Sequence, residues 1–340
     1  KHTTMSDKIQ VLVAIDYADD IVQRLQAISP QLKVERHFPN VPDRVWKKTE
    51  VMVTSSTFPT RQQAPNLKWI QLNSAGMEHA THTPLIADSD IIVTSTSGIH
   101  ATPMAEYTLG MMLAWEYRLP AMLRDQQQSL WRNNRGDIYA PRHLRGQTLG
   151  IIGYGSIGRE IARLAHQFGM NVLAMKRDVM HPADRDSYRE AGTGDVEGEI
   201  PERLYPPEAL ATMVRECDYV VVLAPLVADT VNMVDADVLA AMKESAVLIN
   251  IARGRVVDEQ ALIKALSENH IAGAILDVFG EEPLPKSSPL WQMQNVIISP
   301  HIAGNSARYH EKAAAVFAEN LQRYIERRDL LNQLDREKGY

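Results

Sequence analysis

Short apolar runs alternate with helix-like patterns along almost the whole chain. In the first hundred residues, apolar runs at 8–14, 50–55, 67–73 and 90–95 are typical of buried strands. Residues 19–28 and 102–118 instead place their apolar positions at helical spacing, and Pro103 suits a first helical turn. These segments predict the alternation of strand and helix that builds a parallel sheet.

A second series begins at residue 147 and is longer than the first. It predicts strands at 147–153, 171–175, 219–224, 246–250, 272–278 and 295–300, with helices at 156–169, 235–242 and 258–269. Single helices between apolar strands imply right-handed crossovers and sheets covered on both faces. The pattern therefore predicts an α/β fold with Rossmann-like, doubly wound parallel sheets. A last helix, at about 306–327, follows with no strand after it and could return to the first domain.

One segment breaks the pattern. Residues 178–207 are poor in apolar side chains and rich in glycine, proline and charge. A stretch of this length inside a compact domain is a lid, an arm or a mobile loop. We interpret it as a surface insertion, with a lid as the alternative.

Composition narrows the function classes. The 340 residues carry 45% hydrophobic and 23% charged side chains and a formal charge of −6, which is ordinary for a globular protein. No Lys/Arg-rich run predicts a nucleic-acid partner, and no run of about 18 apolar residues predicts a membrane span. The single cysteine, Cys217, lies at the start of an apolar run and is interpreted as a core residue. With no apolar signal core before the first strand, we expect a cytoplasmic protein.

The stretch GIIGYGSIG (150–158) carries the first functional signal. Gly153 permits a tight turn, Gly155 lets the backbone approach a pyrophosphate, and Gly158 lets the helix pack on the strand. The phosphate charge then faces the free N–H groups of the helix N-terminus. Because the glycines follow an apolar strand and open an amphipathic helix, the sequence predicts a dinucleotide site.

The end of the next strand indicates which nucleotide binds. NAD is selected by an acidic residue that accepts the ribose hydroxyls, but Lys176 and Arg177 stand at this point. Two cations can neutralise and hydrogen-bond a 2′-phosphate, so we expect NADP(H) to be preferred. NAD(H) remains possible, with Asp178 serving the ribose.

Three polar residues follow strands of the second series. Arg253 lies after strand 246–250, Glu282 after strand 272–278, and His301 after strand 295–300. Ligands bind at the carboxyl ends of strands in such sheets, so the three can converge on one cleft. Histidine can donate the proton that reduction of a ketone requires, and a neighbouring carboxylate stabilises its charged form. Arginine can grip a substrate carboxylate with two hydrogen bonds.

The motifs GYGSIG, LINIARGRVVDEQALIKAL, AGAILDVFGEEPLP and NVIISPHIAG occur in that order between about 147 and 305. In this set and order the chain resembles the D-isomer-specific 2-hydroxyacid dehydrogenases, and NSAGMEH and PMAEYTLGMMLA extend the resemblance over nearly the whole chain. The resemblance implies that Arg253, Glu282 and His301 are the catalytic trio and that Asp277 faces the nicotinamide. It implies that the substrate carboxylate meets the backbone of Ala75 and Gly76 as well as Arg253. The remaining expected cofactor contacts are Ser156, Ile157, Pro225, Ala252 and Gly304, and no metal is expected.

The resemblance also implies a domain division and an assembly. Residues 5–103 and 305–340 form a discontinuous substrate-binding domain, and residues 104–304 form the dinucleotide-binding domain. Members of the family are similar in dimerising through the nucleotide domain, including helix 102–118 and the loop after it, so we expect a homodimer.

The expected activity is the NAD(P)H-dependent reduction of a small 2-ketoacid, of the glyoxylate or hydroxypyruvate kind, to the D-2-hydroxyacid. Trp46, Tyr139 and Tyr309 are interpreted as packing residues in preference to pocket residues. Glu282 argues against the formate dehydrogenases, which resemble this family but carry glutamine there. Phosphite or another acid as substrate, and a non-enzymatic corepressor that senses dinucleotide, remain as alternatives. Their test is turnover of 2-ketoacids with each reduced nucleotide.

Overall fold

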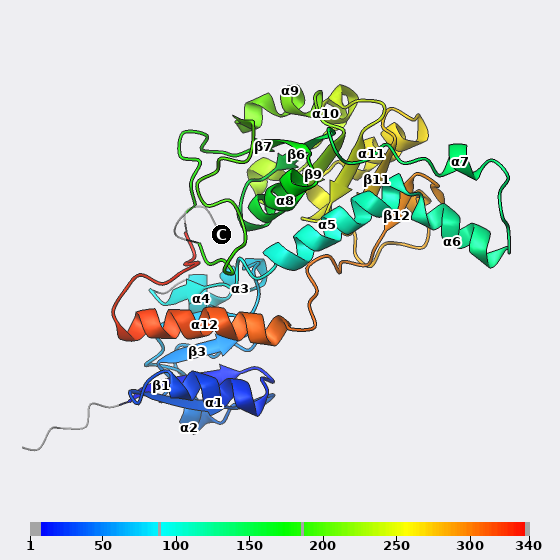
Figure 1. Ribbon diagram of the computed structural model, residues 1–340. Helices are drawn as coiled ribbons and strands as arrows, with labels where there is room; N and C mark the ends of the chain where they lie inside the picture. Colours follow the sequence, from blue (N-terminus) through cyan, green and yellow to red (C-terminus); the bar gives the residue numbers. More distant parts are fainter. Residues whose placement is uncertain (1–7, 88–89, 185–186, 337–340) are drawn as a thin grey trace, which may run out of the picture. The chain divides into compact units, whose positions relative to one another are not determined.

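The computed structural model describes residues 8–87, 90–184 and 187–336, which form two compact units (Figure 1). Unit 1 contains residues 8–87, 90–99, 187–190 and 306–336, and unit 2 contains residues 100–184 and 191–305. Each unit is built on one all-parallel sheet with helices on its faces. The predicted α/β fold with two doubly wound parallel sheets is confirmed.

The sheet of unit 1 has five strands in the order β2-β1-β3-β4-β5. The strands are β1 (Ile9–Ala14), β2 (Leu32–Arg36), β3 (Val51–Thr54), β4 (Trp69–Leu72) and β5 (Ile92–Thr94). The helices are α1 (Asp19–Ala27), α2 (Asp43–Trp46), α3 (Glu78–Thr81), α4 (Pro84–Ala87) and α12 (Tyr309–Ile325). The strand order reverses beside β1, which is where such sheets bind ligands.

Alternating residues of β1 enter two different cores, as expected for a strand buried on both faces. Val11 and Val13 belong to a cluster with residues of α1 and α12, including Leu25 and Phe317. Leu12 belongs to the cluster on the other face, with Trp46, Leu85 and Ile86. Trp46 is therefore a packing residue, as the sequence indicated.

The sheet of unit 2 has seven strands in the order β12-β11-β10-β9-β6-β7-β8. They are β6 (Thr148–Ile152), β7 (Asn171–Met175), β8 (Arg203–Tyr205), β9 (Tyr219–Val222), β10 (Val247–Asn250), β11 (Gly273–Leu276) and β12 (Val296–Ile298). The order reverses between β6 and β9, as in dinucleotide-binding sheets. The glycine turn follows β6 at this reversal.

Helices cover both faces of the seven-stranded sheet. One core joins alternate strand residues such as Ile151 and Val221 to α5 (Ala101–Glu116) and α8 (Ser156–Gln167). The opposite core joins residues such as Val220 and Leu248 to α9 (Leu210–Val214), α10 (Ala236–Ala241) and α11 (Glu259–Ser267). Two further helices, α6 (Leu119–Gln127) and α7 (Arg135–Ile138), follow α5 (Figure 1).

The interpretation of 178–207 as one surface insertion needs a correction. Its last residues form the edge strand β8, which pairs in parallel with β7. The Tyr205 side chain of this strand is buried in the core that α9 covers, so this end of the segment belongs to the sheet. Residues 178–202, below called the insertion, contain the non-sheet part, of which 185 and 186 lie outside the described residues. Within it, residues 187–190 group with unit 1, where Tyr188 packs with Ile99 and Val316.

None of the helices in the described ranges combines the length and the apolar character that a bilayer crossing requires. Cys217 is buried, and burial raises the pKa of its thiol to about 12, so it is a core residue. In the same ranges, no group of three or more His, Cys, Asp or Glu side chains is placed to hold a metal ion.

Candidate active site

The three glycines of the turn after β6 have three different environments. Gly153 has φ of 107°, and a Cβ there would lie 2.9 Å from the backbone nitrogen of Ala224. At Gly158 a Cβ would lie 2.6 Å from the carbonyl oxygen of Gly153. Gly155 is exposed, and a Cβ there would meet nothing within 4 Å. Two glycines are thus required by the fold, whereas the third leaves open space over the turn.

The start of α8 is suited to an anion. Gly155 is its N-cap residue and supplies no side-chain cap for the first N–H groups of this helix of 12 residues. Ser156 and Ile157 form the first turn and are half-buried. Uncapped N–H groups and the positive end of the helix dipole favour a phosphate at this position. The residues present therefore fit a dinucleotide, whose pyrophosphate these groups would hold.

Lys176 and Arg177 stand directly after β7, as the sequence predicted. The Lys176 ammonium donates to the carbonyl oxygen of His181, and Arg177 is exposed. Burial, followed by the nearby charge of Arg159, lowers the pKa of Lys176. Positive charge is therefore concentrated at this strand end, which favours an anionic ligand.

Three loops carry the predicted trio, and their strands are neighbours. Arg253 follows β10, Glu282 follows β11 and His301 follows β12, and these strands pair in parallel in the order β12-β11-β10. Because parallel strands end at the same edge of a sheet, the three loops lie at one edge. The loops also touch, since a Cβ at Gly254 would lie 1.9 Å from the backbone carbon of Phe279.

Glu282 and His301 form a direct pair. The distance from His301 Nδ1 to Glu282 Oε2 is 2.7 Å, and the carboxylate accepts the hydrogen bond because an ionised carboxylate has no donor. The other oxygen of Glu282 accepts the N–H of Phe279 at 3.0 Å. The His301 side chain is 51% exposed, and Nε2 makes no hydrogen bond within the described residues. Nε2 is therefore the nitrogen that can meet a ligand.

The backbone of His301 is held in an unusual conformation. Its φ is 55°, in the left-handed region that few residues other than glycine adopt. The His301 N–H donates to the carbonyl oxygen of Asp277, while the Asp277 carboxylate accepts the N–H groups of Ile302 and Ala303, each at 2.8 Å. Such strain at an exposed imidazole is typical of functional sites, where the surrounding structure maintains it.

Asp277 itself is buried, and its carboxylate oxygens bond to the loop that carries His301. Besides its predicted role at the nicotinamide, Asp277 therefore supports the loop that carries His301. Ser299 Oγ donates to Asp277 Oδ1 at 2.5 Å, and Tyr107 of α5 donates to Ser299 at 2.6 Å. Burial, and after it the charge of Asp277, raises the pKa of Tyr107, so the phenol remains a donor.

Sequence reasoning missed Ser299 and Tyr107, and also Asn250 at the end of β10. Asn250 is buried, accepts the N–H of Ala252 at 3.2 Å and donates to the carbonyl oxygen of Arg253 at 3.1 Å. These bonds fix the backbone on both sides of the arginine. The position of Asn250 directly before the IARG motif was a signal that could have identified it.

The other predicted cofactor positions lie on the same edge of the sheet of unit 2. Pro225 follows β9, and its carbonyl oxygen accepts the hydroxyl of Thr230. Ala252 lies between β10 and Arg253, and Gly304 follows His301. The carbonyl oxygen of Gly304 lies 3.1 Å from Nδ1 of His100.

The predicted substrate loop lies in unit 1, directly after β4. Asn73 holds its start, because Tyr17 donates to Asn73 Oδ1 and Tyr309 donates to the Asn73 carbonyl oxygen, both at 2.7 Å. Over the described part of the chain, the N–H groups of Ala75 and Gly76 donate no hydrogen bond. Two available N–H groups in a held loop can bind a carboxylate. Tyr309 therefore positions this loop, while Tyr139 donates to Asp125 and belongs to the segment after α6.

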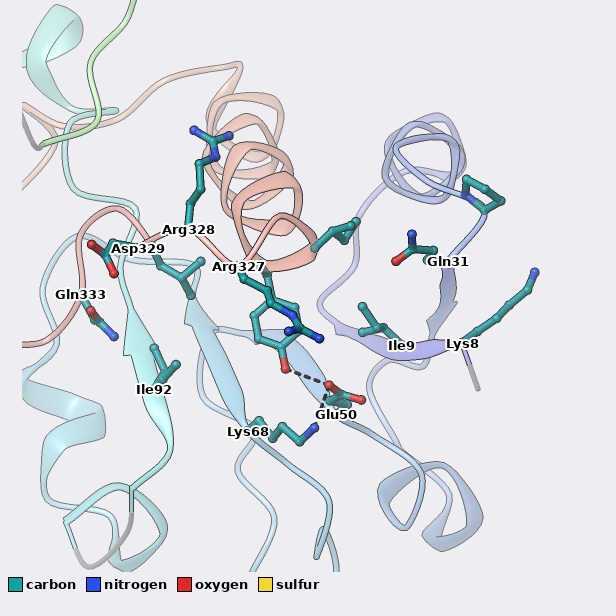
Figure 2. Close-up of a pocket in the computed structure, with 14 residues that line it drawn as sticks. Lys8, Ile9, Gln31, Glu50, Lys68, Ile92, Arg327, Arg328, Asp329 and Gln333 are labelled. Atoms are coloured by element: carbon teal, nitrogen blue, oxygen red, sulfur yellow. Dashed lines mark hydrogen bonds and ion pairs between the residues drawn. The ribbon is translucent and has the colours of Figure 1, made fainter. Parts of the chain in front are cut away.

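A cavity of about 890 Å³ lies elsewhere in unit 1 (Figure 2). Its lining includes Lys8, Glu50 and Lys68, which precede β1, β3 and β4. The Glu50 carboxylate accepts the Tyr324 hydroxyl at 2.8 Å and lies 3.1 Å from the Lys68 ammonium. The cavity therefore lies at the amino edge of the sheet, opposite the edge where Ala75 and Gly76 follow β4, and it contains none of the predicted site residues.

Comparisons with known proteins agree with this geometry. A family model described as D-isomer specific 2-hydroxyacid dehydrogenase, NAD binding domain, matches residues 109–303. The glyoxylate reductase of Thermofilum pendens is 35% identical over 260 residues, which cover 76% of this chain and 72% of that protein. The glyoxylate/hydroxypyruvate reductase B of Pectobacterium atrosepticum is 32% identical over 257 residues, which cover 75% of each chain.

Among solved structures, a D-isomer specific 2-hydroxyacid dehydrogenase from Xanthobacter autotrophicus Py2 in complex with NADPH and MES has a TM-score of 0.77. It is 29% identical in sequence, and the alignment covers 98% of this chain and all of that one. The similarity therefore extends over both units.

Proposed function

The chain belongs to the D-isomer-specific 2-hydroxyacid dehydrogenase family, and from this premise we propose that it reduces a small 2-ketoacid to the D-2-hydroxyacid with NADPH. The resemblance indicated by the sequence motifs is thereby confirmed. The observation that carries the proposal is the pairing of His301 with Glu282 at the strand end beside Arg253. An exposed imidazole supported by a carboxylate is a proton donor suited to a carbonyl oxygen.

Each residue of the trio has a distinct proposed role. A bound reduced nicotinamide supplies the hydride that forms the new C–H bond at the ketone carbon. As the carbon–oxygen double bond opens, Nε2 of His301 gives its proton to the oxygen, and Glu282 stabilises the charged imidazole beforehand. Arg253 holds the substrate carboxylate and polarises the neighbouring carbonyl. Solvent then returns a proton to His301.

The substrate carboxylate has a second proposed partner in unit 1. The N–H groups of Ala75 and Gly76 are available, and Asn73 fixes the loop through two tyrosine hydroxyls. Backbone donors arranged in this way bind anions without a charged side chain. We propose that they and Arg253 select a 2-ketoacid over an uncharged ketone.

NADP(H) is the proposed nucleotide, with NAD(H) as a weaker ligand. Lys176 and Arg177 concentrate positive charge where the adenosine ribose is recognised. The Xanthobacter autotrophicus relative was crystallised with NADPH, which supports the same assignment. In this scheme Gly155, Ser156 and Ile157 hold the pyrophosphate, while Gly153 and Gly158 allow the tight turn and the helix packing that place them.

Glyoxylate or hydroxypyruvate is the proposed substrate class. The support comes from the relatives from Thermofilum pendens and Pectobacterium atrosepticum, whose names specify these acids. Both acids are small and carry the carboxylate beside the carbonyl, as the proposed roles of Arg253 and Gly76 require.

The proposed assembly is a homodimer formed through unit 2. Several large apolar side chains are exposed on α6 and around it, namely Tyr117, Leu119, Leu123, Leu130 and Trp131. Trp131 is 79% exposed, and so many exposed large apolar side chains in one short segment favour a protein–protein interface there. Asp125 binds Arg132 and Tyr139, which keeps the segment after α6 ordered.

The proposed function is tested by initial rates for several 2-ketoacids with each reduced nucleotide. Glyoxylate, hydroxypyruvate, pyruvate and a longer branched 2-ketoacid are each assayed with NADPH and with NADH. We expect turnover of at least glyoxylate and hydroxypyruvate, with NADPH preferred. Tight nucleotide binding with no turnover of any acid would refute the reductase and favour a sensor.

A further inference from the structure

The insertion packs on the helix that follows the glycine turn, and one buried arginine makes the connection. Arg159 follows Gly158 in α8 and is 3% exposed. Its Nη1 donates to the carbonyl oxygen of Asp195, and its Nη2 donates to that of Pro182. The guanidinium also lies 4.8 Å from the ring centre of Tyr154, within the glycine turn. One side chain therefore joins the nucleotide turn to two points of the insertion.

Asp195 organises the other side of this connection. It is buried, and its carboxylate accepts the Tyr154 hydroxyl at 2.6 Å and the N–H groups of Gly198, Glu199 and Ile200, each at 3.1 Å. Four donors on one carboxylate fix both the turn that contains it and its orientation toward α8. Residues 195–200 of the insertion are thus held against Tyr154 and Arg159.

The bond to Pro182 reaches the strand end that recognises the ribose. Lys176 follows β7 and donates to the carbonyl oxygen of His181, and the next residue, Pro182, accepts from Arg159. Asp178 closes the same turn by accepting the N–H groups of Met180 and His181 at 3.1 and 3.3 Å. Residues 176–182 are therefore tied at one end to β7 and at the other to α8.

We propose that Arg159 is a positioning residue for nucleotide selectivity, which holds turn 176–182 so that Lys176 and Arg177 meet the 2′-phosphate of NADPH. The insertion supplies the acceptors that keep Arg159 in place. This inference rests on the proposed function only in its choice of nucleotide, because it concerns binding and not the chemical step. A purely supportive role for Arg159 in α8 would affect NADPH and NADH equally.

The experiment measures the Kd of NADPH, NADH and adenosine 2′,5′-bisphosphate for the full chain without substrate. Arg159→Met keeps much of the side-chain volume and removes both donors. We expect its Kd for NADPH and for the bisphosphate to rise about tenfold, the loss of one charge-assisted hydrogen bond, and its Kd for NADH to change less than about twofold. Arg159→Lys, which keeps the charge, should recover part of the loss.

Arg163→Met is the matched control. Arg163 lies on the same helix and pairs at 2.6 Å with the buried Glu160, which also accepts the N–H of Gly194. Loss of Arg163 therefore disturbs α8 and a contact of α8 with the insertion, but removes no hydrogen bond to turn 176–182. We expect the ratio of the two nucleotide Kd values to stay at the wild-type value. Should Arg159→Met fail to fold, Tyr154→Phe removes one donor to Asp195 and should reduce NADPH binding selectively, by about threefold for a partial loss of positioning.

Equal weakening of both nucleotides in Arg159→Met, or an unchanged ratio, overturns the inference and leaves the proposed reductase intact. A wild-type chain that binds NADPH selectively but reduces no 2-ketoacid overturns the proposed function instead, while the selectivity comparison still stands. A wild-type chain with no preference for NADPH overturns the inference together with the nucleotide assignment.

Discussion

His301 Nδ1 lies 2.7 Å from Glu282 Oε2, and the second oxygen of that carboxylate accepts the N–H of Phe279. The carboxylate is thus oriented by its own loop while it fixes the tautomer and the direction of the imidazole. With Nδ1 occupied, Nε2 faces outward on a side chain that is 51% exposed. The pair has the geometry of a general acid and its supporting base.

Replacing the imidazole should remove proton transfer and leave nucleotide binding intact. For His301→Gln we expect kcat to fall by about two to four powers of ten, the usual contribution of a positioned acid. The Kd of NADPH should stay within about twofold of the wild-type value, because the glycine turn that would hold the pyrophosphate is far from His301 in the sequence. Steady-state kinetics and nucleotide titration measure the two quantities separately. A variant with wild-type kcat would remove His301 from the mechanism.

The close approach of the arginine loop to the acid loop can be tested at Gly254. A Cβ at this position would lie 1.9 Å from the carbon and 2.4 Å from the nitrogen of the neighbouring backbone at Phe279 and Gly280. We expect Gly254→Ala to lower the free energy of unfolding by about 1–3 kcal/mol, as overpacking does. It should also lower kcat, because Arg253 moves with its neighbour.

Gly110→Ala is the matched control for that substitution. Gly110 lies in the exposed face of α5, and a Cβ there would meet nothing within 4 Å. Alanine should stabilise the helix by about 0.5–1 kcal/mol and leave activity unchanged. Thermal or denaturant unfolding distinguishes the two glycines, and equal effects at both would contradict the close contact.

The cations after β7 should set the nucleotide preference directly. For Lys176→Asp combined with Arg177→Pro, we expect the ratio of kcat/KM for NADPH to that for NADH to fall at least about tenfold, because the phosphate loses its partners and the ribose gains an acceptor. Lys264→Asp, at an exposed position of α11, changes the net charge in the same direction and should leave the ratio alone. An unchanged ratio in the double variant refutes the phosphate assignment.

The exposed apolar residues around α6 should hold the dimer together. A buried carboxylate without a partner is costly, so Leu123→Glu with Trp131→Glu should convert a dimer of about 76 kDa, twice the 38.1 kDa chain, to monomers. Light scattering coupled to size-exclusion chromatography gives the mass. Trp291→Glu, at another exposed tryptophan of unit 2, is the control and should remain dimeric. A monomeric wild type contradicts the assembly.

The sequence predicted every strand of the two sheets except β2 and β8, each of which lies at one edge of its sheet. Strands such as β9 and β11 are apolar along their whole length because both faces are covered. By contrast, β2 reads LKVER with only Leu32 buried, and β8 has three residues, so neither has a pattern that separates it from a loop. Edge strands depend on their neighbour for identity, which local patterns do not record.

The residues of the candidate site also differ in how well the sequence predicts them. Arg253, Glu282 and His301 were predicted because each lies in the loop that follows an apolar strand. Tyr107 could not be found, because it reaches Ser299 across 192 positions of sequence and looks like one more apolar residue of α5. Arg159 likewise reads as an exposed helix residue until the insertion covers it.

The central claim is that the ketone carbon receives hydride from the nicotinamide while His301 protonates the oxygen. Turnover of glyoxylate and of hydroxypyruvate with NADPH deuterated at the transferable C4 position tests it most directly, with mass spectrometry for the label and chiral chromatography for the glycerate formed. We expect one deuterium at C2 of each product and only D-glycerate, with the rate lost in His301→Gln. Products without label at C2, or L-glycerate, would contradict the account.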